Sequence, residues 1–262
     1  MSLNRSERLA DQYKRLFSEF VKSVRNMGLN IPERNLEFSF ELMNDWNMLS
    51  TLDEVEKWYE NKLEKEDMDV CEISLKDCRG WVTEEGRIYH ESKEFFSIEG
   101  IRVKNTKNRE VSSGWDQPII KQVGWDGGIL GLIRKRFNGV PHYLIEAKAE
   151  PGNPNMVQMS PSLQATFSNI KKAHQGREPK HLSFFQNPEL HNAIVHYKQW
   201  LAEDGGRLYN KRNLNMLVEL PESLDLNIDN ENFIWMSMFQ IKKCLLRDAW
   251  VNPHVRGIIS HM

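Results

Sequence analysis

The chain has 262 residues, with 35 basic and 37 acidic side chains, a net charge of -2 and 40% apolar residues. This length allows one large domain or two small ones, and the composition is typical of a globular protein and excludes a disordered one. The near balance of charge excludes a polybasic nucleic-acid binder, because such proteins gain affinity by neutralising phosphates. Three cysteines, Cys71, Cys78 and Cys244, are too few for a disulfide framework and favour a reducing setting.

No stretch of the sequence predicts a membrane span. The longest apolar run, Gly127–Ile133, ends at Arg134, well short of the roughly 20 residues that a transmembrane helix needs. The first residues include Arg5 and Glu7 and lack the apolar core of a signal peptide. We therefore expect a soluble, cytoplasmic protein that binds neither a membrane nor nucleic acid.

The first 65 residues have a helical pattern. Apolar side chains recur there at steps of three and four residues, with charged residues between them, and Gly28 and Pro32 end this stretch. A second helix is expected from Thr51, which has capping-box spacing to Glu54. The apolar stripes of the two helices are Leu9, Tyr13, Leu16, Phe17, Phe20 and Val24 in the first, and Leu52, Val55, Tyr59 and Leu63 in the second.

From Trp81 onward, short apolar runs alternate with turn residues, which indicates strands. The clearest element is a hairpin of Ile129–Phe137 and Val140–Ala149, because Asn138-Gly139 between two apolar runs suits a type I′ turn. The remaining expected elements are a strand at Met156–Met159, a helix from Ser160-Pro161 towards Gly176, strands at Ile194–Trp200 and Asn215–Leu220, and a helix at Met236–Arg247 with Phe239, Cys244 and Leu246 buried. We predict an α+β fold, with a helical segment at residues 1–70 and a sheet-containing domain at residues 71–262.

The second strand of the hairpin carries the most suggestive side chains. Alternation places Tyr143, Ile145, Ala147 and Ala149 on a core face, and His142, Leu144, Glu146, Lys148 and Glu150 on the other. Composition alone favours a solvent-facing charge ladder for the second set. The alternative is an acid–base group, because the turn residues 151–153 that follow mark a sheet margin, where active sites are common.

Three further polar clusters are candidates for binding, and each also has a structural interpretation. Seven amides and hydroxyls between Gln158 and Asn169 suit a sugar or a base, or else a helix cap with a polar face. Residues 203–209, with Gly205-Gly206 beside Arg207 and Tyr209, suit a diphosphate or an ordinary turn. Tryptophans at turns, Trp115 and Trp125, suit stacking on a base or covering a core edge.

Several motifs are missing from the sequence. It contains no dinucleotide-binding or P-loop glycine pattern, no serine-hydrolase elbow, and no histidine or cysteine spacing typical of a metal site. We therefore expect neither a cofactor nor a metal.

Taken together, the motifs resemble the NDP-hexose 2,3-dehydratase family, from about Trp46 to Ser260. The matching strings are Phe95–Gly100 with Arg102-Val103, Arg109-Glu110, Trp115–Pro118, Ala147–Asn153, Gln158–Thr166 with Ser168-Asn169, Gly205–Tyr209 with Arg212-Asn213, and Phe233–Trp235 through Gln240 to Val251-Asn252 and Arg256. The strings A-K-A-E-P-G-N and S-P-x-x-Q-A-T are the specific ones.

The resemblance implies a Nudix-like fold, a mixed or antiparallel sheet flanked by helices, without Nudix hydrolase chemistry. It also implies a substrate such as TDP-4-keto-6-deoxy-glucose, losing water across C2 and C3 in deoxysugar biosynthesis. The family usually has two tandem copies of this unit and this chain has one, which suggests either a homodimer or a copy that binds without catalysing. Two further departures are His254, where the family tends to have an acid, and Glu146, where it often has an amide.

Roles follow from the chemistry that the resemblance implies, in which a base removes the C3 proton and the C2 hydroxyl leaves. We assign Lys148 to the enolate oxygen, Glu150 as acid or base, and His90 as a second base candidate. Trp115 and Tyr209 are candidates for stacking on the base, and Arg102, Arg207 and Arg256 for the diphosphate. The polar candidates for the sugar and base edges are Gln117, Gln164, Thr166, Ser168 and Asn169. The alternatives are a silent nucleotide-sugar-binding subunit and a 4-keto-sugar isomerase that uses the same enolate.

Overall fold

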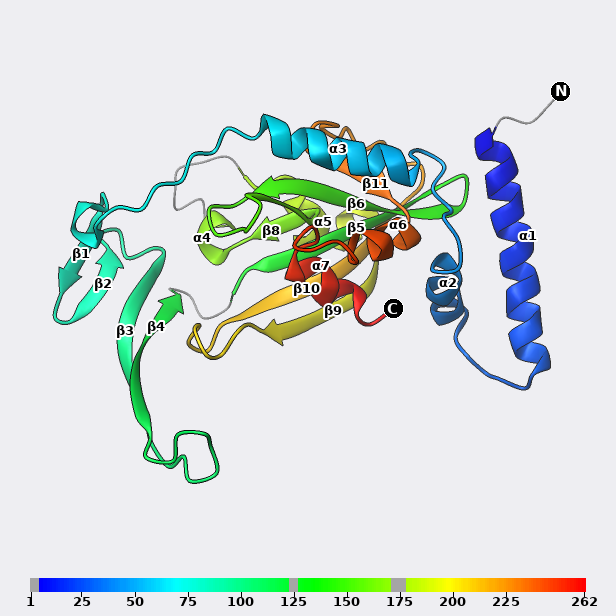
Figure 1. Ribbon diagram of the computed structural model, residues 1–262. Coiled ribbons are helices and arrows are strands. Elements are labelled where there is room, and N and C mark those ends of the chain that lie inside the picture. Colours follow the sequence, from blue (N-terminus) through cyan, green and yellow to red (C-terminus); the bar gives the residue numbers. More distant parts are fainter. Residues whose placement is uncertain (1–4, 123–126, 171–177) are drawn as a thin grey trace.

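The computed structural model describes residues 5–122, 127–170 and 178–262 (Figure 1). The helices are α1 (Arg5–Asn26), α2 (Glu33–Glu41), α3 (Leu52–Lys65), α4 (Phe167–Ile170), α5 (Leu182–Gln186), α6 (Met238–Cys244) and α7 (Pro253–Ile259), with short 3-10 turns at Leu75–Asp77 and Pro188–His191. The strands are β1 (Trp81–Glu84), β2 (Arg87–His90), β3 (Phe96–Val103), β4 (Trp115–Gln122), β5 (Ile129–Phe137), β6 (Val140–Ala149), β7 (Val157–Pro161), β8 (Leu163–Ala165), β9 (Ile194–Ala202), β10 (Arg212–Leu220) and β11 (Phe233–Met236). This arrangement confirms the predicted α+β class.

The helices of the first 65 residues confirm the sequence pattern. Thr51 caps α3 as a capping box with Glu54, and Val55 and Tyr59 of its stripe are fully buried. The helix predicted at Met236–Arg247 is shorter in the structure, because α6 covers only Met238–Cys244, and Phe239 within it is partly exposed rather than buried. The prediction that Leu246 is buried is wrong, since it is 78% exposed beyond the end of that helix.

A large mixed sheet forms the centre of the molecule. Its strand order is β11-β6-β5-β10-β9, and β5 pairs in parallel with β10 while its other pairings are antiparallel. The predicted hairpin of β5 and β6 is confirmed, and its turn residues Asn138 and Gly139 have φ values of 49° and 84°, the left-handed pair that a type I′ turn requires.

Away from that turn, β5 and β6 separate, and β7 and β8 fill the gap between them. β7 pairs with β6 from Ile145 onward, while β8 pairs with β5 up to Gly131. Ser162 lies at the fork, where its hydroxyl donates to Leu144 O at 2.5 Å and accepts from Ile133 N at 2.9 Å. The chain thus uses a buried hydroxyl to join the two diverging strands.

The predicted helix from Ser160-Pro161 is therefore wrong. Both residues are buried in β7, with Ser160 opposite Glu146, because the chain here pairs with β6 instead of starting a helix. The helix that follows, α4, covers Phe167–Ile170, and residues 171–176 of the prediction lie outside the described residues.

Both faces of β6 are covered, so the solvent-facing charge ladder is also wrong. Tyr143, Ile145 and Ala147 pack in a core with α2, α3, α6 and α7, while Leu144 packs in a second core with α5. His142, on the same face as Leu144, is fully buried. Only the C-terminal part of the strand, from Glu146 onward, is partly exposed to solvent.

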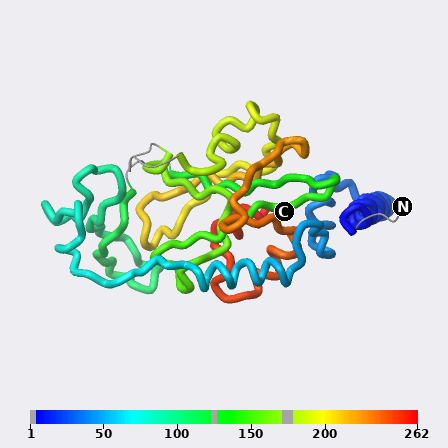
Figure 2. The backbone as a smooth tube through the Cα atoms, turned by 90° about the horizontal axis from the view of Figure 1, so that it is seen from above, coloured from blue at the N-terminus to red at the C-terminus, as the bar shows by residue number. Residues whose placement is uncertain are grey.

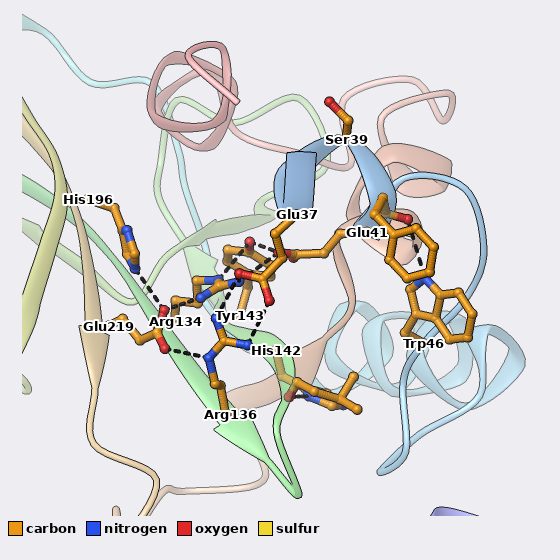
Figure 3. A network of polar contacts seen from close by, with 12 residues as sticks. Glu37, Ser39, Glu41, Trp46, Arg134, Arg136, His142, Tyr143, His196 and Glu219 are labelled. Carbon is orange, nitrogen blue, oxygen red and sulfur yellow. Dashed lines mark hydrogen bonds and ion pairs between the residues drawn. The ribbon is translucent and has the colours of Figure 1, made fainter. Parts of the chain in front are cut away.

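A buried ionic network attaches α2 to the sheet (Figure 3). Arg134 of β5 has no exposed side-chain surface and donates to Glu37 at 2.9 Å, to Glu41 at 2.7 Å and to Glu219 of β10. Arg136 bridges Glu37 and Glu219 at 2.7 and 2.8 Å. Every one of these charges has an oppositely charged partner, which is the condition under which buried ions are tolerated.

A separate sheet of β1-β2-β3-β4 lies at one end of the elongated molecule, and α1 lies at the other (Figure 2). The edge strand β4 of this small sheet contacts the loop between β9 and β10 through a parallel bridge between Ile120 and Leu208. In the part of the chain that is described, no helix has the length and apolar character needed to cross a membrane.

Candidate active site

Polar side chains gather at one end of the large sheet, where β6, β8 and β9 end and β5 and β10 begin. Gly128 makes this convergence possible, because a Cβ there would lie 2.1 Å from Ala165 O. Only glycine lets the start of β5 approach the end of β8 so closely. The end of β8 is thereby held beside the end of β6.

Lys148, Glu150 and Gln164 form the first group at this end of the sheet. Lys148 Nζ lies 3.8 Å from Glu150 Oε1 and 3.4 Å from the carbonyl oxygen of Gln164. The Gln164 amide donates to Glu150 Oε1 at 2.8 Å, while its own Oε1 is buried without a hydrogen-bond partner among the described residues. The predicted pair of ammonium and carboxylate therefore exists, and it is half-buried rather than free in solvent.

Glu203, Lys211 and His254 form the second group. Glu203 and Lys211 face each other where β9 and β10 are joined, with Glu203 N donating to Lys211 O at 3.0 Å. His254 lies at the start of α7, and Asn252 caps this helix by accepting a hydrogen bond from His254 N. The Nδ1 atom of His254 lies 3.9 Å from Glu203 Oε1. The Asn213 amide donates to Glu203 and fixes the carboxylate.

The two groups lie near each other at this end of the sheet, since the charges of Glu150 and Lys148 act on His254 as well as those of Glu203 and Lys211. Burial lowers the pKa of His254, so its imidazole is neutral at neutral pH. Burial also lowers the pKa of Lys211, whose Nζ has no hydrogen-bond partner in the described chain. The site thus contains two cations, two carboxylates and a neutral imidazole.

Glu146 lies beside this site, two residues before Lys148 on the same face of β6. Burial raises its pKa to about 7, although the charges of Lys148 and Lys180 act in the opposite direction. Near neutral pH, part of the population therefore carries a protonated Glu146 next to Lys148. A carboxyl with such a pKa can give or take a proton at little cost.

Two of the predicted binding residues join the small sheet to the loop of residues 203–211. Trp115 Nε1 donates to Gln117 Oε1 at 2.6 Å, and the Gln117 amide donates to Gly206 O at 2.8 Å. Tyr209 N donates to Ile120 O at 2.8 Å, and the ring of Tyr209 is exposed. The clusters around Trp115 and Gly205-Gly206 are therefore neighbours, as a shared nucleotide site would require.

The three predicted diphosphate arginines have different surroundings. Arg102 makes two hydrogen bonds to Asp116, at 2.9 and 2.8 Å, on the exposed surface of the small sheet. Arg207 pairs with Asp204 in the loop. Arg256 of α7 donates to Val251 O at 3.1 Å, close to the start of the helix that carries His254.

The polar residues after β8 serve a helix start. Thr166 Oγ1 accepts from Asn169 N at 3.3 Å and contacts Ser168 Oγ at 3.0 Å, at the first turn of α4. The structural interpretation of this cluster, a helix cap with a polar face, therefore describes Thr166, Ser168 and Asn169.

His90 is not brought to the site. It lies in β2, towards the outer edge of the small sheet, and its Nδ1 contacts Ser92 Oγ at 2.8 Å (Figure 1). Its ring packs edge-on against Trp81 and Phe95. His90 therefore makes its contacts within the small sheet, next to the turn that follows β2.

No pattern in the sequence predicts a catalytic role for Glu203, Lys211 or His254. Glu203 belongs to the candidate diphosphate cluster of residues 203–209, His254 is noted only as a departure from the family, and Lys211 has no signal. The one local signal was the helix start at Asn252-Pro253, which places His254 in the first turn of α7. Nothing local connects that turn to Glu203, because the approach depends on how α7 packs. No group of three histidine, cysteine or acidic side chains suited to a metal ion occurs in residues 5–122, 127–170 and 178–262.

The site brings together side chains that can exchange protons, and sequence comparison shows the family. The model of the family NDP-hexose 2,3-dehydratase matches residues 52–262, and the chain belongs to this family. A relative from Amycolatopsis orientalis, dTDP-4-dehydro-6-deoxy-alpha-D-glucopyranose 2,3-dehydratase, is 36% identical over 79% of this chain and 44% of its own length. Relatives of the same name from Streptomyces violaceoruber and Saccharopolyspora spinosa are 37% and 32% identical, over 73% and 89% of this chain and 42% and 46% of their own lengths.

The chain thus spans less than half the length of these curated relatives. Among solved structures, a crystal structure described as an ADP compounds hydrolase matches 63% of this chain and 83% of its own, with a TM-score of 0.35 and 10% identity. A likeness this slight supports no conclusion about the site.

Proposed function

We propose that the chain is a hydro-lyase that removes water across C2 and C3 of a nucleotide-linked 4-keto-6-deoxy-hexose. The observation that supports this most directly is the half-buried group of Lys148, Glu150 and Gln164 at the end of the sheet. The names of the relatives, all 2,3-dehydratases of a dTDP-linked 4-dehydro-6-deoxy sugar, support the substrate class.

The reaction needs proton transfers and charge stabilisation, but no change of oxidation state by an external reagent. A base takes the proton from C3, and the electrons of that bond move towards the C4 carbonyl to give an enolate. The enolate then reforms the carbonyl, the C2=C3 bond forms and the C2–O bond breaks. An acid donates a proton to the departing hydroxyl, which leaves as water.

Lys148 suits the enolate, because an ammonium near a developing negative oxygen stabilises it strongly in a partly dry site. Glu150 suits acid or base catalysis, since its carboxylate is oriented by the Gln164 amide. Trp115, Gln117, Arg207 and Tyr209 suit the nucleotide, since they lie together where β4 meets the loop of residues 203–211.

We also propose the organisation around this site. Residues 71–262 form the dehydratase unit and residues 1–70 a helical segment packed on it, in a cytoplasmic protein. We propose that two copies of the chain form a homodimer, as the family resemblance suggests.

Incubating the purified chain with a nucleotide-linked 4-keto-6-deoxy-hexose in D₂O tests the proposal. Release of water with formation of the unsaturated or diketo product supports the lyase. Deuterium at C3 without water loss would instead indicate an isomerase that uses the same enolate. Binding with neither reaction would indicate a silent nucleotide-sugar-binding subunit.

A further inference from the structure

The proposed reaction needs both a base at C3 and an acid at the C2 oxygen, and the site contains more than one candidate for each. Glu150 is engaged by the Gln164 amide at 2.8 Å and by Lys148 at 3.8 Å. Both contacts are made to the same carboxylate oxygen, Oε1, so part of the hydrogen-bonding capacity of Glu150 is already used within the chain. A group outside this pair is therefore better placed to be the base.

We propose that His254, supported by Glu203, is the base that removes the C3 proton. This inference rests on the proposed function. It keeps Lys148 at the enolate oxygen.

The contacts of His254 and Glu203 support this assignment. Nδ1 of His254 faces Glu203 Oε1 at 3.9 Å, and Glu203 is fixed in turn by the amide of Asn213. Nε2 is then the nitrogen that is left for substrate, since the described residues supply it with no hydrogen bond. Pairs of this kind are often long without substrate and tighten when it binds.

The charges that face His254 suit a base rather than an acid. Four charged groups act on the imidazole, Glu203 and Glu150 with negative charge and Lys148 and Lys211 with positive charge. At rest, burial and the two lysines keep the imidazole neutral, so it is ready to accept a proton. Once it has taken the C3 proton, the Glu203 carboxylate stabilises the imidazolium, which removes the need for a second base.

The test compares two site variants with a matched control. His254→Gln and Glu203→Gln each remove one member of the proposed pair. His196→Gln is the control, because His196 pairs with Glu219 at 2.7 Å near the opposite end of β9 and contacts none of the proposed site residues. For each variant, C3–deuterium exchange, water loss, substrate affinity and melting temperature are measured.

We expect His254→Gln to lose C3 exchange and water loss together, each by about 10²–10⁴-fold, with substrate affinity and melting temperature retained. Glu203→Gln should keep part of the rate and shift the acidic limb of the kcat/KM profile to lower pH, since losing the carboxylate lowers the imidazole pKa. His196→Gln should keep the full rate, even if its melting temperature falls.

Two results would overturn the assignment. One is a His254→Gln chain that still exchanges C3 at the wild-type rate, and the other is a Glu203→Gln chain with an unmoved acidic limb. If the wild-type chain itself neither exchanges nor loses water, the proposed function and this inference fall together. If the wild type is active and His254→Gln is unimpaired, the base assignment alone is wrong.

Discussion

The two ends of the large sheet hold similar charged side chains in different states of partnership. At the α2 end, Arg134 and Arg136 contact three carboxylates, with most distances between 2.7 and 2.9 Å (Figure 3). At the other end, Lys148 lies 3.8 Å from Glu150, His254 lies 3.9 Å from Glu203, and Lys211 Nζ lacks a hydrogen-bond partner among the described residues. The same strands, β5 and β10, run through both.

This difference separates a structural ionic network from the proposed catalytic one. A buried charge whose hydrogen bonds are all made by the protein holds elements together and has nothing left to offer a ligand. A half-buried charge with a long or missing contact keeps part of its hydrogen-bonding capacity for a substrate. Substitution of single charged side chains, each with a matched control, tests this comparison.

The largest effect on stability is expected from Arg134→Met. Removal of the guanidinium leaves Glu37, Glu41 and Glu219 buried with too little positive charge, which typically destabilises a protein by about 3–5 kcal/mol. Denaturant unfolding measures the change. The control is Arg15→Met, whose exposed pair with Glu19 contributes little. A loss for Arg134→Met no larger than that of the control would mean that the network does not hold α2.

Lys148→Met should have the complementary effect. We expect turnover to fall by about 10²–10³-fold, because the enolate oxygen loses its cation, while the free energy of unfolding changes little. The control is Lys62→Met on α3, a half-buried lysine that pairs with Glu66 at 3.5 Å away from the site. Steady-state kinetics and unfolding of both variants decide the point, and an unimpaired Lys148→Met chain would remove Lys148 from the mechanism.

A third prediction concerns the pH dependence of stability at the site end. Burial raises the pKa of Glu146 to about 7 in the folded chain, above its ordinary value near 4.5. The folded state therefore holds the proton more tightly than the unfolded state, so stability is greatest below pH 4.5 and is lost as the pH rises through 7. Glu146→Gln removes this dependence.

Relative to wild type, Glu146→Gln should gain about 1–3 kcal/mol at pH 8.5 compared with its difference at pH 5. Unfolding of both chains at the two pH values measures the gain. Glu150→Gln is the control, because it makes the same substitution near the end of the same strand at a more exposed side chain. Parallel pH curves for wild type and Glu146→Gln would show that Glu146 is ionised throughout.

The sequence predicts the elements that local chemistry determines. The Asn138-Gly139 turn and the Thr51 capping box depend on neighbours a few residues away, and both are confirmed. Ser160-Pro161 has an equally good local signal for a helix, but Ser162 is needed at the fork between β5 and β6. Tertiary packing therefore overrides the helix signal there.

The same limit applies to the site. Lys148 and Glu150 can be found by counting along one strand, because alternation alone places them together. Glu203 and His254 meet only because α7 packs across the sheet, which no local pattern encodes. His90 is the opposite case. Its residue type makes it a candidate base, but its contacts lie within the small sheet.

The smallest effect is expected from Arg207, and it bears on where the diphosphate binds. Arg207 and Asp204 form an exposed pair beside Gly206, within the cluster that also holds Gln117 and Tyr209. Because an exposed pair adds little to stability, Arg207→Ala should leave the melting temperature unchanged. If the guanidinium binds phosphate oxygens in both ground and transition states, KM should rise about tenfold with kcat unaltered.

Arg25→Ala is the matched control, because Arg25 forms a comparable exposed pair with Glu33 at 3.0 Å on the helical segment. A KM for Arg207→Ala equal to that of the control would identify the Arg207 pair as a surface feature. The diphosphate would then need another cation near the sheet end, and Lys211 is the candidate, since its buried ammonium has the unused hydrogen-bonding capacity that sets this end of the sheet apart from the Arg134 end.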